Sequence, residues 1–313
     1  MTLKDVAKLA NVSVSTVSKA INGAKDVSES TRLEILEIAE KSGYFSEKKR
    51  VSLENKSKSS FTVAIICPEI ISVHYSEYAT SITREVENLG GNCIVYVYNF
   101  DETQLCRIVE SCDKDKNIHA IVSLTDGITT KNTPLLLAVS VGYTIETNTT
   151  VDKAEEYLKS LNHKEIGFAG ENHTVAKAEN FKKSCPGNEK FVFTSEERFE
   201  KAGEKAAEYY AANGIPTAVI CAYDEIAFGL IDRFEKMGIN VPDDVSVVGI
   251  NNIKPAKYCF GGVTTVESGW NETVKEEIRK LYKLVAENKT DIIRRTVVAS
   301  PYVVERATVK RRD

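Results

Sequence analysis

The residues whose types could do chemistry are concentrated near the N-terminus, in VSVSTVSKAING at positions 12–23. This stretch has four hydroxyl side chains and a single charged residue, Lys19. Serine, threonine and valine are poor helix formers, so helix propensity alone does not account for them. Hydroxyl and ammonium groups can instead bind phosphate oxygens and the edges of bases. The stretch therefore suggests contact with nucleic acid.

Three short helices are expected to position this stretch. Apolar residues repeat on one helical face within 3–10, and Ser13 is a suitable cap for a second helix from Val14 to about position 22. A third segment, at 28–44, begins with a serine cap and ends in Gly-Tyr. Two short helices, a tight turn and a closing third helix form the helix-turn-helix plan. The alternative is an ordinary three-helix core with a polar surface.

The outer face of the second helix would meet the DNA, because its apolar positions turn inward at spacings of three and four. We expect Val14, Ser15 and Lys19 to face base edges, with Lys19 bonding to guanine. Other hydroxyl and amide groups, some near helix N-termini, could hold phosphates. The residues expected to do so are Thr2, Ser13, Thr16, Ser18, Asn22, Ser28 and Thr31.

About the first 45 residues resemble the DNA-binding headpiece of the LacI/GalR family of bacterial transcription regulators. The shared motifs are DVA, VS-x-x-TVS with an asparagine after it, VS-x-x-TR and a final Gly-Tyr. The resemblance implies a headpiece at 1–46 that binds a palindromic double-stranded operator. It also implies a homodimer in the cytoplasm that regulates transcription, as a repressor.

The segment that follows is polar and charged, and its composition is that of a linker, assigned to 47–60. In the resembled family this segment folds as a hinge helix on the operator and inserts a leucine into the minor groove. Counting from Gly-Tyr, Leu53 falls at that leucine. Arg50, with the two lysines before it, would favour phosphates. An unstructured tether is the alternative.

The charge distribution is consistent with a DNA-binding N-terminal part, residues 1–60, followed by a globular part, 61–313. Residues 1–60 hold 11 Lys and Arg against 8 Asp and Glu, a net charge of +3, which leaves −7 for 61–313. The seven cysteines are scattered, so we expect buried reduced thiols and a cytoplasmic protein. Neither a signal peptide nor a run of eighteen apolar residues is apparent, so no membrane partner is expected.

From position 61 on, strand-like and helix-like segments alternate, which predicts parallel, doubly wound sheets. The complete fold class is thus an all-α helix-turn-helix headpiece followed by an α/β core of two doubly wound lobes. The core also resembles that of the LacI/GalR family, which looks like a periplasmic sugar-binding protein. The matching stretches are LNHKEIGFAG, CAYDEIAFGLIDRFEKMGINVPDDVSVVGINN, VTTVES and VVASPYVVERAT.

The resemblance implies three crossings between the lobes. Lobe one would comprise 61–148 and 267–297, and lobe two 149–266 and 298–313. Between positions 125 and 150 the family normally has a further helix and strand, and we expect this part of lobe one to be trimmed.

In the resembled family a small molecule, often a sugar or nucleobase, binds between the lobes. Here Lys177 replaces the usual arginine, Asn251 the usual aspartate, and Thr149 an aspartate near the first crossing. The candidate effector-binding residues are His74, Tyr75, Lys177, Phe199, Tyr223, Asp224 and Asn251. One interpretation is a changed effector, for which a phosphorylated or acidic sugar fits the lysine better than a neutral hexose. The other is a cleft that has lost its ligand.

Two other classes of function are weaker. A sugar-binding transport protein would explain the core but not the helix-turn-helix. An enzyme is disfavoured because G-x-G-x-x-G, a P-loop, a Ser-His-Asp set and a metal-ligand set are all missing. We therefore predict no catalytic residue, no metal and no cofactor.

Overall fold

The computed structural model describes residues 2–21, 27–42, 61–138, 150–287, 294–296 and 300–313. The predictions for Asn22, Arg50, Leu53 and Thr149 lie outside these ranges. No helix in the described residues is long and apolar enough to cross a bilayer.

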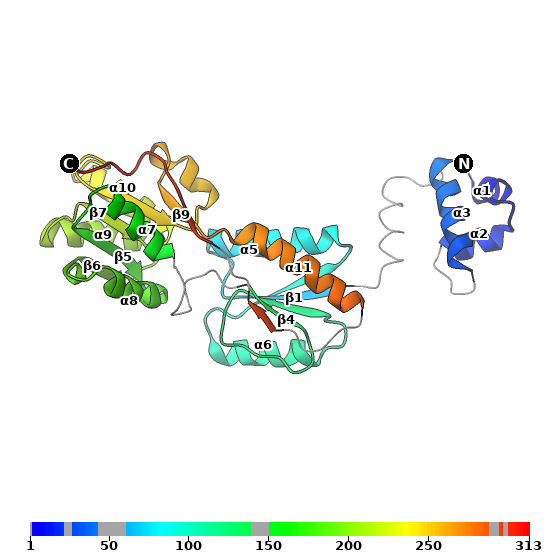
Figure 1. Cartoon of the computed structure of the whole chain (residues 1–313). Coiled ribbons are helices and arrows are strands. Elements are labelled where there is room, and N and C mark those ends of the chain that lie inside the picture. The colour runs from blue at the N-terminus through cyan, green and yellow to red at the C-terminus, as the bar shows by residue number, and fades with distance from the viewer. Residues whose placement is uncertain (1, 22–26, 43–60, 139–149, 288–293, 297–299) are drawn as a thin grey trace.

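The headpiece consists of α1 (Leu3–Leu9), α2 (Val14–Ile21) and α3 (Glu29–Lys41), which pack on one another (Figure 1). Serine caps begin the second and third helices as predicted. The Oγ of Ser13 accepts the Thr16 amide at 3.0 Å, and that of Ser28 accepts the Thr31 amide at 3.2 Å. The inward positions predicted for α2 are buried. The small core comprises Val6, Ala7, Val17, Ala20, Ile21, Ile35 and Ala39.

Lobe one is a parallel five-stranded sheet in the order β10-β4-β3-β1-β2. Its strands are β1 (Thr62–Cys67), β2 (Asn92–Val97), β3 (Ala120–Ser123), β4 (Leu135–Leu137) and β10 (Arg294–Thr296). Its helices are α5 (Val73–Asn88), α6 (Glu102–Lys114) and α11 (Trp270–Ala286). Side chains of β1 alternate between two apolar cores, one beneath α5 and α11 and the other beneath α6. Both faces of the sheet are therefore covered, as the doubly wound prediction requires.

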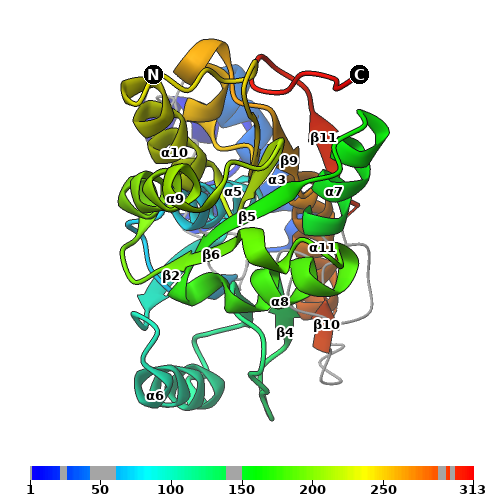
Figure 2. The same ribbon diagram turned by 90° about the vertical axis from the view of Figure 1, so that its left-hand side faces the viewer.

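Lobe two is a six-stranded sheet in the order β11-β9-β8-β7-β5-β6, parallel except for the antiparallel pair β9–β11. Its strands are β5 (Ile166–Glu171), β6 (Val192–Ser195), β7 (Ala218–Cys221), β8 (Ser246–Ile250), β9 (Thr265–Glu267) and β11 (Tyr302–Val304). Its helices are α7 (Thr150–Ser160), α8 (Val175–Ser184), α9 (Phe199–Asn213) and α10 (Asp224–Lys236). The pair α7 and α8 lies across the sheet from α9 and α10 (Figure 2).

The chain passes from lobe two back to lobe one between β9 and α11. Gly269 has a left-handed φ of 72°, and a Cβ there would lie 2.7 Å from the carbonyl oxygen of Ser300. The Trp270 ring stacks on Tyr78 at 3.7 Å, and its Nε1 donates to the Ala138 carbonyl at 3.0 Å. These contacts fix the start of α11 against lobe one.

The expectation for positions 125–150 was wrong in one respect. The strand is retained, because β4 pairs with β3 along Leu135–Leu137. Within 125–138, the described part of this segment before α7, no helix is present. All seven cysteines are free, and Cys67, Cys112, Cys185 and Cys221 are buried.

Candidate functional site

The exposed face of α2 is the first candidate site. Val14, Ser15 and Lys19 are all exposed there, Val14 by 42 %. The Ser13 hydroxyl shares hydrogen bonds of 2.7 Å with the hydroxyls of Ser15 and Thr16. The first turn of α2 thus presents a compact group of hydroxyls at a helix N-terminus, a chemistry suited to phosphate.

The hydroxyls at the starts of the other two helices are also engaged locally. The Thr2 hydroxyl donates to the Asp5 carboxylate at 2.8 Å, and Ser28 and Thr31 share a hydrogen bond of 2.7 Å. Ser18 is partly buried. Thr2, Ser13 and Ser28 therefore lie at helix starts, whereas Thr16, Ser18 and Thr31 lie within helices. The DNA contacts of these residues stay a prediction.

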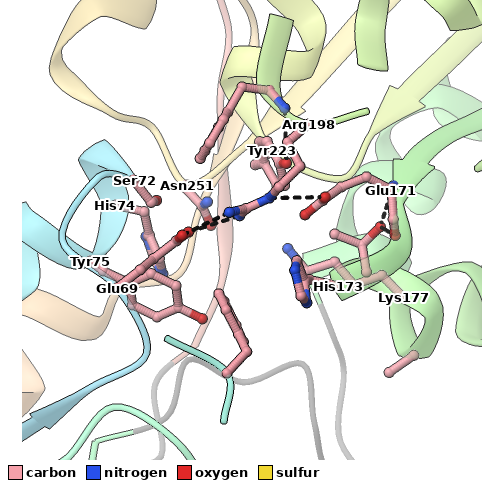
Figure 3. Close-up of a pocket in the computed structure, with 14 residues that line it drawn as sticks. Glu69, Ser72, His74, Tyr75, Glu171, His173, Lys177, Arg198, Tyr223 and Asn251 are labelled. Atoms are coloured by element: carbon pink, nitrogen blue, oxygen red, sulfur yellow. Dashed lines mark hydrogen bonds and ion pairs between the residues drawn. The ribbon is translucent and has the colours of Figure 1, made fainter. Parts of the chain in front are cut away.

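The second candidate site is a cavity of about 70 Å³ between the lobes (Figure 3). It lies beyond the carboxyl ends of parallel strands, where open α/β sheets generally bind ligands. Glu69 follows β1, Glu171 ends β5, Arg198 follows β6, Tyr223 follows β7, and Asn251 follows β8. Parallel topology is thus what brings these distant residues together.

Arg198 spans the cavity. Its Nη1 and Nη2 donate to the two carboxylate oxygens of Glu69 in lobe one, at 2.7 and 2.8 Å. Its Nε donates to Glu171 of lobe two at 3.1 Å. Both glutamates are buried. The hydrogen bonds to Glu69, and then the negative charge of Glu171, hold the pKa of Arg198 above its usual range. The second oxygen of Glu171, Oε1, is buried without a hydrogen-bond partner.

Aromatic rings surround this ion pair. Phe100 of lobe one stacks on His173 of lobe two at 4.0 Å with an interplanar angle of 15°. The Arg198 guanidinium carbon lies 4.4 Å from the Phe199 ring centroid and 5.7 Å from that of Phe100. The lobes therefore touch through both charge and stacking.

Two ionisable side chains of the cavity lining have pKa values shifted by burial. Lys177 donates to the Ala222 carbonyl at 2.7 Å, and burial lowers its pKa to about 8 against the opposing pull of Asp224 and Glu225. Burial, with the nearby charge of Lys177, lowers the pKa of His74 to about 3. That imidazole is consequently neutral at neutral pH.

Six of the seven predicted effector residues line this cavity: His74, Tyr75, Lys177, Phe199, Tyr223 and Asn251. Asp224 does not line it. Its carboxylate is fully buried and accepts hydrogen bonds from Thr265 Oγ1 at 2.6 Å and from the Ile253 amide at 2.8 Å. Asp224 therefore joins β9 and the loop after β8 to the start of α10.

Sequence reasoning missed the residues that fill the cleft. The available signal was a charged or aromatic residue soon after an apolar, strand-like segment. The missed residues are Glu69, Phe100, Glu171, His173 and Arg198.

A helix-turn-helix joined to a two-lobed α/β core defines a DNA-binding transcriptional regulator. The family model described as "Bacterial regulatory proteins, lacI family" matches residues 2–47, and "Periplasmic binding protein-like domain" matches 156–309. The chain therefore carries a DNA-binding domain that matches the LacI family and a core that matches periplasmic-binding-protein-like domains. Members of this family are transcriptional regulators, not enzymes. Within the described residues, no group of three or more His, Cys, Asp or Glu could hold a metal.

Curated relatives align over nearly the whole chain. Catabolite control protein A of Priestia megaterium is 25% identical over 340 residues, covering 97% of this chain and 98% of that protein. The transcriptional repressor PurR of Vibrio cholerae serotype O1 is 26% identical over 343 residues, covering 99% and 98%.

Solved structures share the fold. The Lac repressor dimer bound to operator and an anti-inducer has a TM-score of 0.69 at 18% identity, with 99% of each chain covered. The regulator CelR in complex with cellobiose has a TM-score of 0.62 at 18% identity, covering 98% of this chain and 99% of that one.

Proposed function

We propose that this regulator is a repressor that binds a palindromic operator as a homodimer in the cytoplasm. The exposed face of α2 carries the proposal, since Val14, Ser15 and Lys19 are exposed on a helix whose opposite face packs into the small core of the headpiece. Side chains on such a face can reach base edges in the major groove.

The edge of lobe one supports a dimer. Strand β2 is the last strand of its sheet, and Ile94 and Val95 on it are 42% and 43% exposed. Apolar residues on an open sheet edge favour association with another chain. A second copy would place two headpieces side by side, as two half-sites require.

The charges of the interlobe cavity bear on the effector. Glu69 and Glu171 face it, and Lys177 spends a hydrogen bond on a backbone carbonyl. Arg198 pairs with both carboxylates, so the two cations Arg198 and Lys177 of this lining already have partners. This favours the interpretation of a cleft that holds no phosphorylated or acidic sugar.

The test is selection of genomic fragments by the purified protein, followed by gel shifts with wild type and Lys19→Ala. We expect a palindromic site. We also expect Lys19→Ala to lose about 1–3 kcal/mol of specific binding and to relax one base pair in each half-site. Glu34→Ala, an exposed change on α3, is the control. An unchanged base preference in the Lys19 variant would contradict the assignment, and no selected site would contradict the proposed function.

A further inference from the structure

We propose that Arg198 is the resident occupant of the interlobe cleft. Its guanidinium closes the two lobes without an added small molecule, and the site that it fills recognises a guanidinium cation. This inference concerns the core alone and goes beyond the proposed operator function.

Arg198 binds Glu69 with the same two-bond geometry that binding sites use to recognise a guanidinium ligand. Three guanidinium nitrogens of Arg198 are used, two on Glu69 and one on Glu171 (Figure 3). A planar fork that meets a carboxylate with two parallel bonds is the most specific arrangement for this cation, and lysine cannot reproduce it. The two carboxylates belong to different lobes, so the cation bridges them.

The rest of the lining suits a flat cation. The rings of Phe199 and Phe100 lie near the guanidinium, and aromatic faces attract such groups. The remaining space is about 70 Å³, whereas sites for ordinary small-molecule ligands measure roughly 300–1,000 Å³. The Arg198 side chain thus occupies the volume that a sugar would need.

The backbone presents Arg198 in a fixed direction. Phe199, the next residue, has a φ of 54°, a left-handed conformation that is strained for a bulky side chain. This residue begins α9, which is held tightly against α10 because Gly203 and Gly229 allow the two backbones to meet. A strained residue at the start of a firmly packed helix aims the guanidinium at Glu69.

The two glutamates depend on Arg198 for the balance of their charge. Without Arg198, two buried carboxylates would face each other across the cleft with no cation between them, and buried unpaired charges are strongly unfavourable. Separation of the lobes would let water reach both. Removal of this one side chain should therefore open the core.

The experiment uses the full chain with spin labels on Cys106, an exposed native cysteine of lobe one, and on Glu204→Cys, an exposed position of α9. Cys93→Ser and Cys259→Ser remove the two partly exposed thiols. Without ligand we expect one narrow distance distribution, and in Arg198→Ala a longer and broader one. Ethylguanidinium should restore the narrow distribution in Arg198→Ala, whereas ethylurea at the same concentration should not.

Two further variants separate closure from folding. Arg279→Ala is the matched control, because Arg279 pairs with buried Glu85 within lobe one, and its distribution should stay narrow. Glu69→Gln should broaden the distribution even if Arg198→Ala does not fold. A broad wild-type distribution, or a narrow one in both Arg198→Ala and Glu69→Gln, would overturn the proposal. Operator binding by the unlabelled wild type is measured separately, so failure of the proposed function would be distinguishable.

Discussion

Asp224 shows at the scale of one residue how burial changes a carboxyl group. It is fully buried, and burial raises its pKa to about 7 although Thr265 and Ile253 donate hydrogen bonds to it. The folded protein therefore holds this proton more tightly than the unfolded chain, whose aspartate has a pKa of about 3.8. The protonated Asp224 contributes its full stabilisation of the folded state below about pH 4. This contribution is lost as the pH rises through about 7, the pKa in the folded protein.

We predict that Asp224→Asn removes this pH dependence. Between about pH 4 and pH 8 the free energy of unfolding of the wild type should fall by about 2–4 kcal/mol relative to the variant. The variant also loses one hydrogen-bond acceptor, a cost that does not change with pH. Urea unfolding at both pH values measures the difference, with Asp232→Asn on the surface of α10 as control. Parallel pH profiles for wild type and variant would contradict the assignment.

The contacts of Arg198 could not have been predicted from sequence. Glu69 and Arg198 are 129 positions apart, and their pairing depends on how the two lobes meet. Asn251 was found through the family resemblance, and it follows the apolar strand β8. His74 and Tyr75 were expected at the pocket edge after the first strand, and they lie at the start of α5. Strand ends are visible in a sequence, whereas the choice of partner across a cleft is not.

Among the structural elements, α9 and α10 pack with their backbones in close contact. A Cβ on Gly229 would lie 1.8 Å from the carbonyl oxygen of Glu200, and one on Gly203 would lie 2.0 Å from that of Ile226. Neither obstacle is a flexible side chain, so the whole helix would have to move. These glycines therefore set the distance between the two backbones.

We predict that Gly229→Ala destabilises the core by at least about 1–3 kcal/mol, because overpacking must push α10 away from α9. Chemical unfolding measures the loss, and Glu204→Ala on the exposed side of α9 is the control. Stability equal to that of the wild type would mean that the helices separate easily, contrary to this packing.

Secondary structure was predictable where the apolar pattern was long. Strands β1, β5, β7 and β8 coincide with continuous apolar segments, and α10 coincides with a helical repeat, so the alternation predicted from position 61 includes them. Strands β9, β10 and β11 have only three residues each, and neighbours in the sheet rather than their own sequence make them extended. The sequence of α11 also has apolar residues at helical spacing, and Trp270, Val274, Ile278 and Leu281 are buried.

At the scale of the whole molecule, residues 1–60 carry a positive net charge and 61–313 a negative one. We expect this difference to direct the headpiece rather than the core towards DNA. The proposed dimer would place two copies of Leu53 at the centre of the operator. This position lies outside the described residues and rests on the resemblance of the linker to a hinge. The apolar side chain would enter the minor groove and kink the site.

We predict that Leu53→Ala weakens binding to the selected operator and reduces DNA bending while leaving binding to random DNA nearly unchanged. The physical reason is that only the bent, specific complex uses the apolar wedge. Gel mobility of operator fragments permuted around the site measures the bend, and Ser52→Ala is a neighbouring control. If the variant bends the operator as much as the wild type does, Leu53 is not the residue that kinks the site.

Trp270 gives the core its own optical signal. It is the single tryptophan of the chain, it is fully buried, and it lies where the polypeptide crosses between the lobes. Its stacking on Tyr78 and its bond to the Ala138 carbonyl shield the indole from water, so its emission should lie at short wavelength. The headpiece contributes no tryptophan fluorescence at all. The colour of that emission therefore follows the core alone, in the intact regulator and on DNA, without any attached dye.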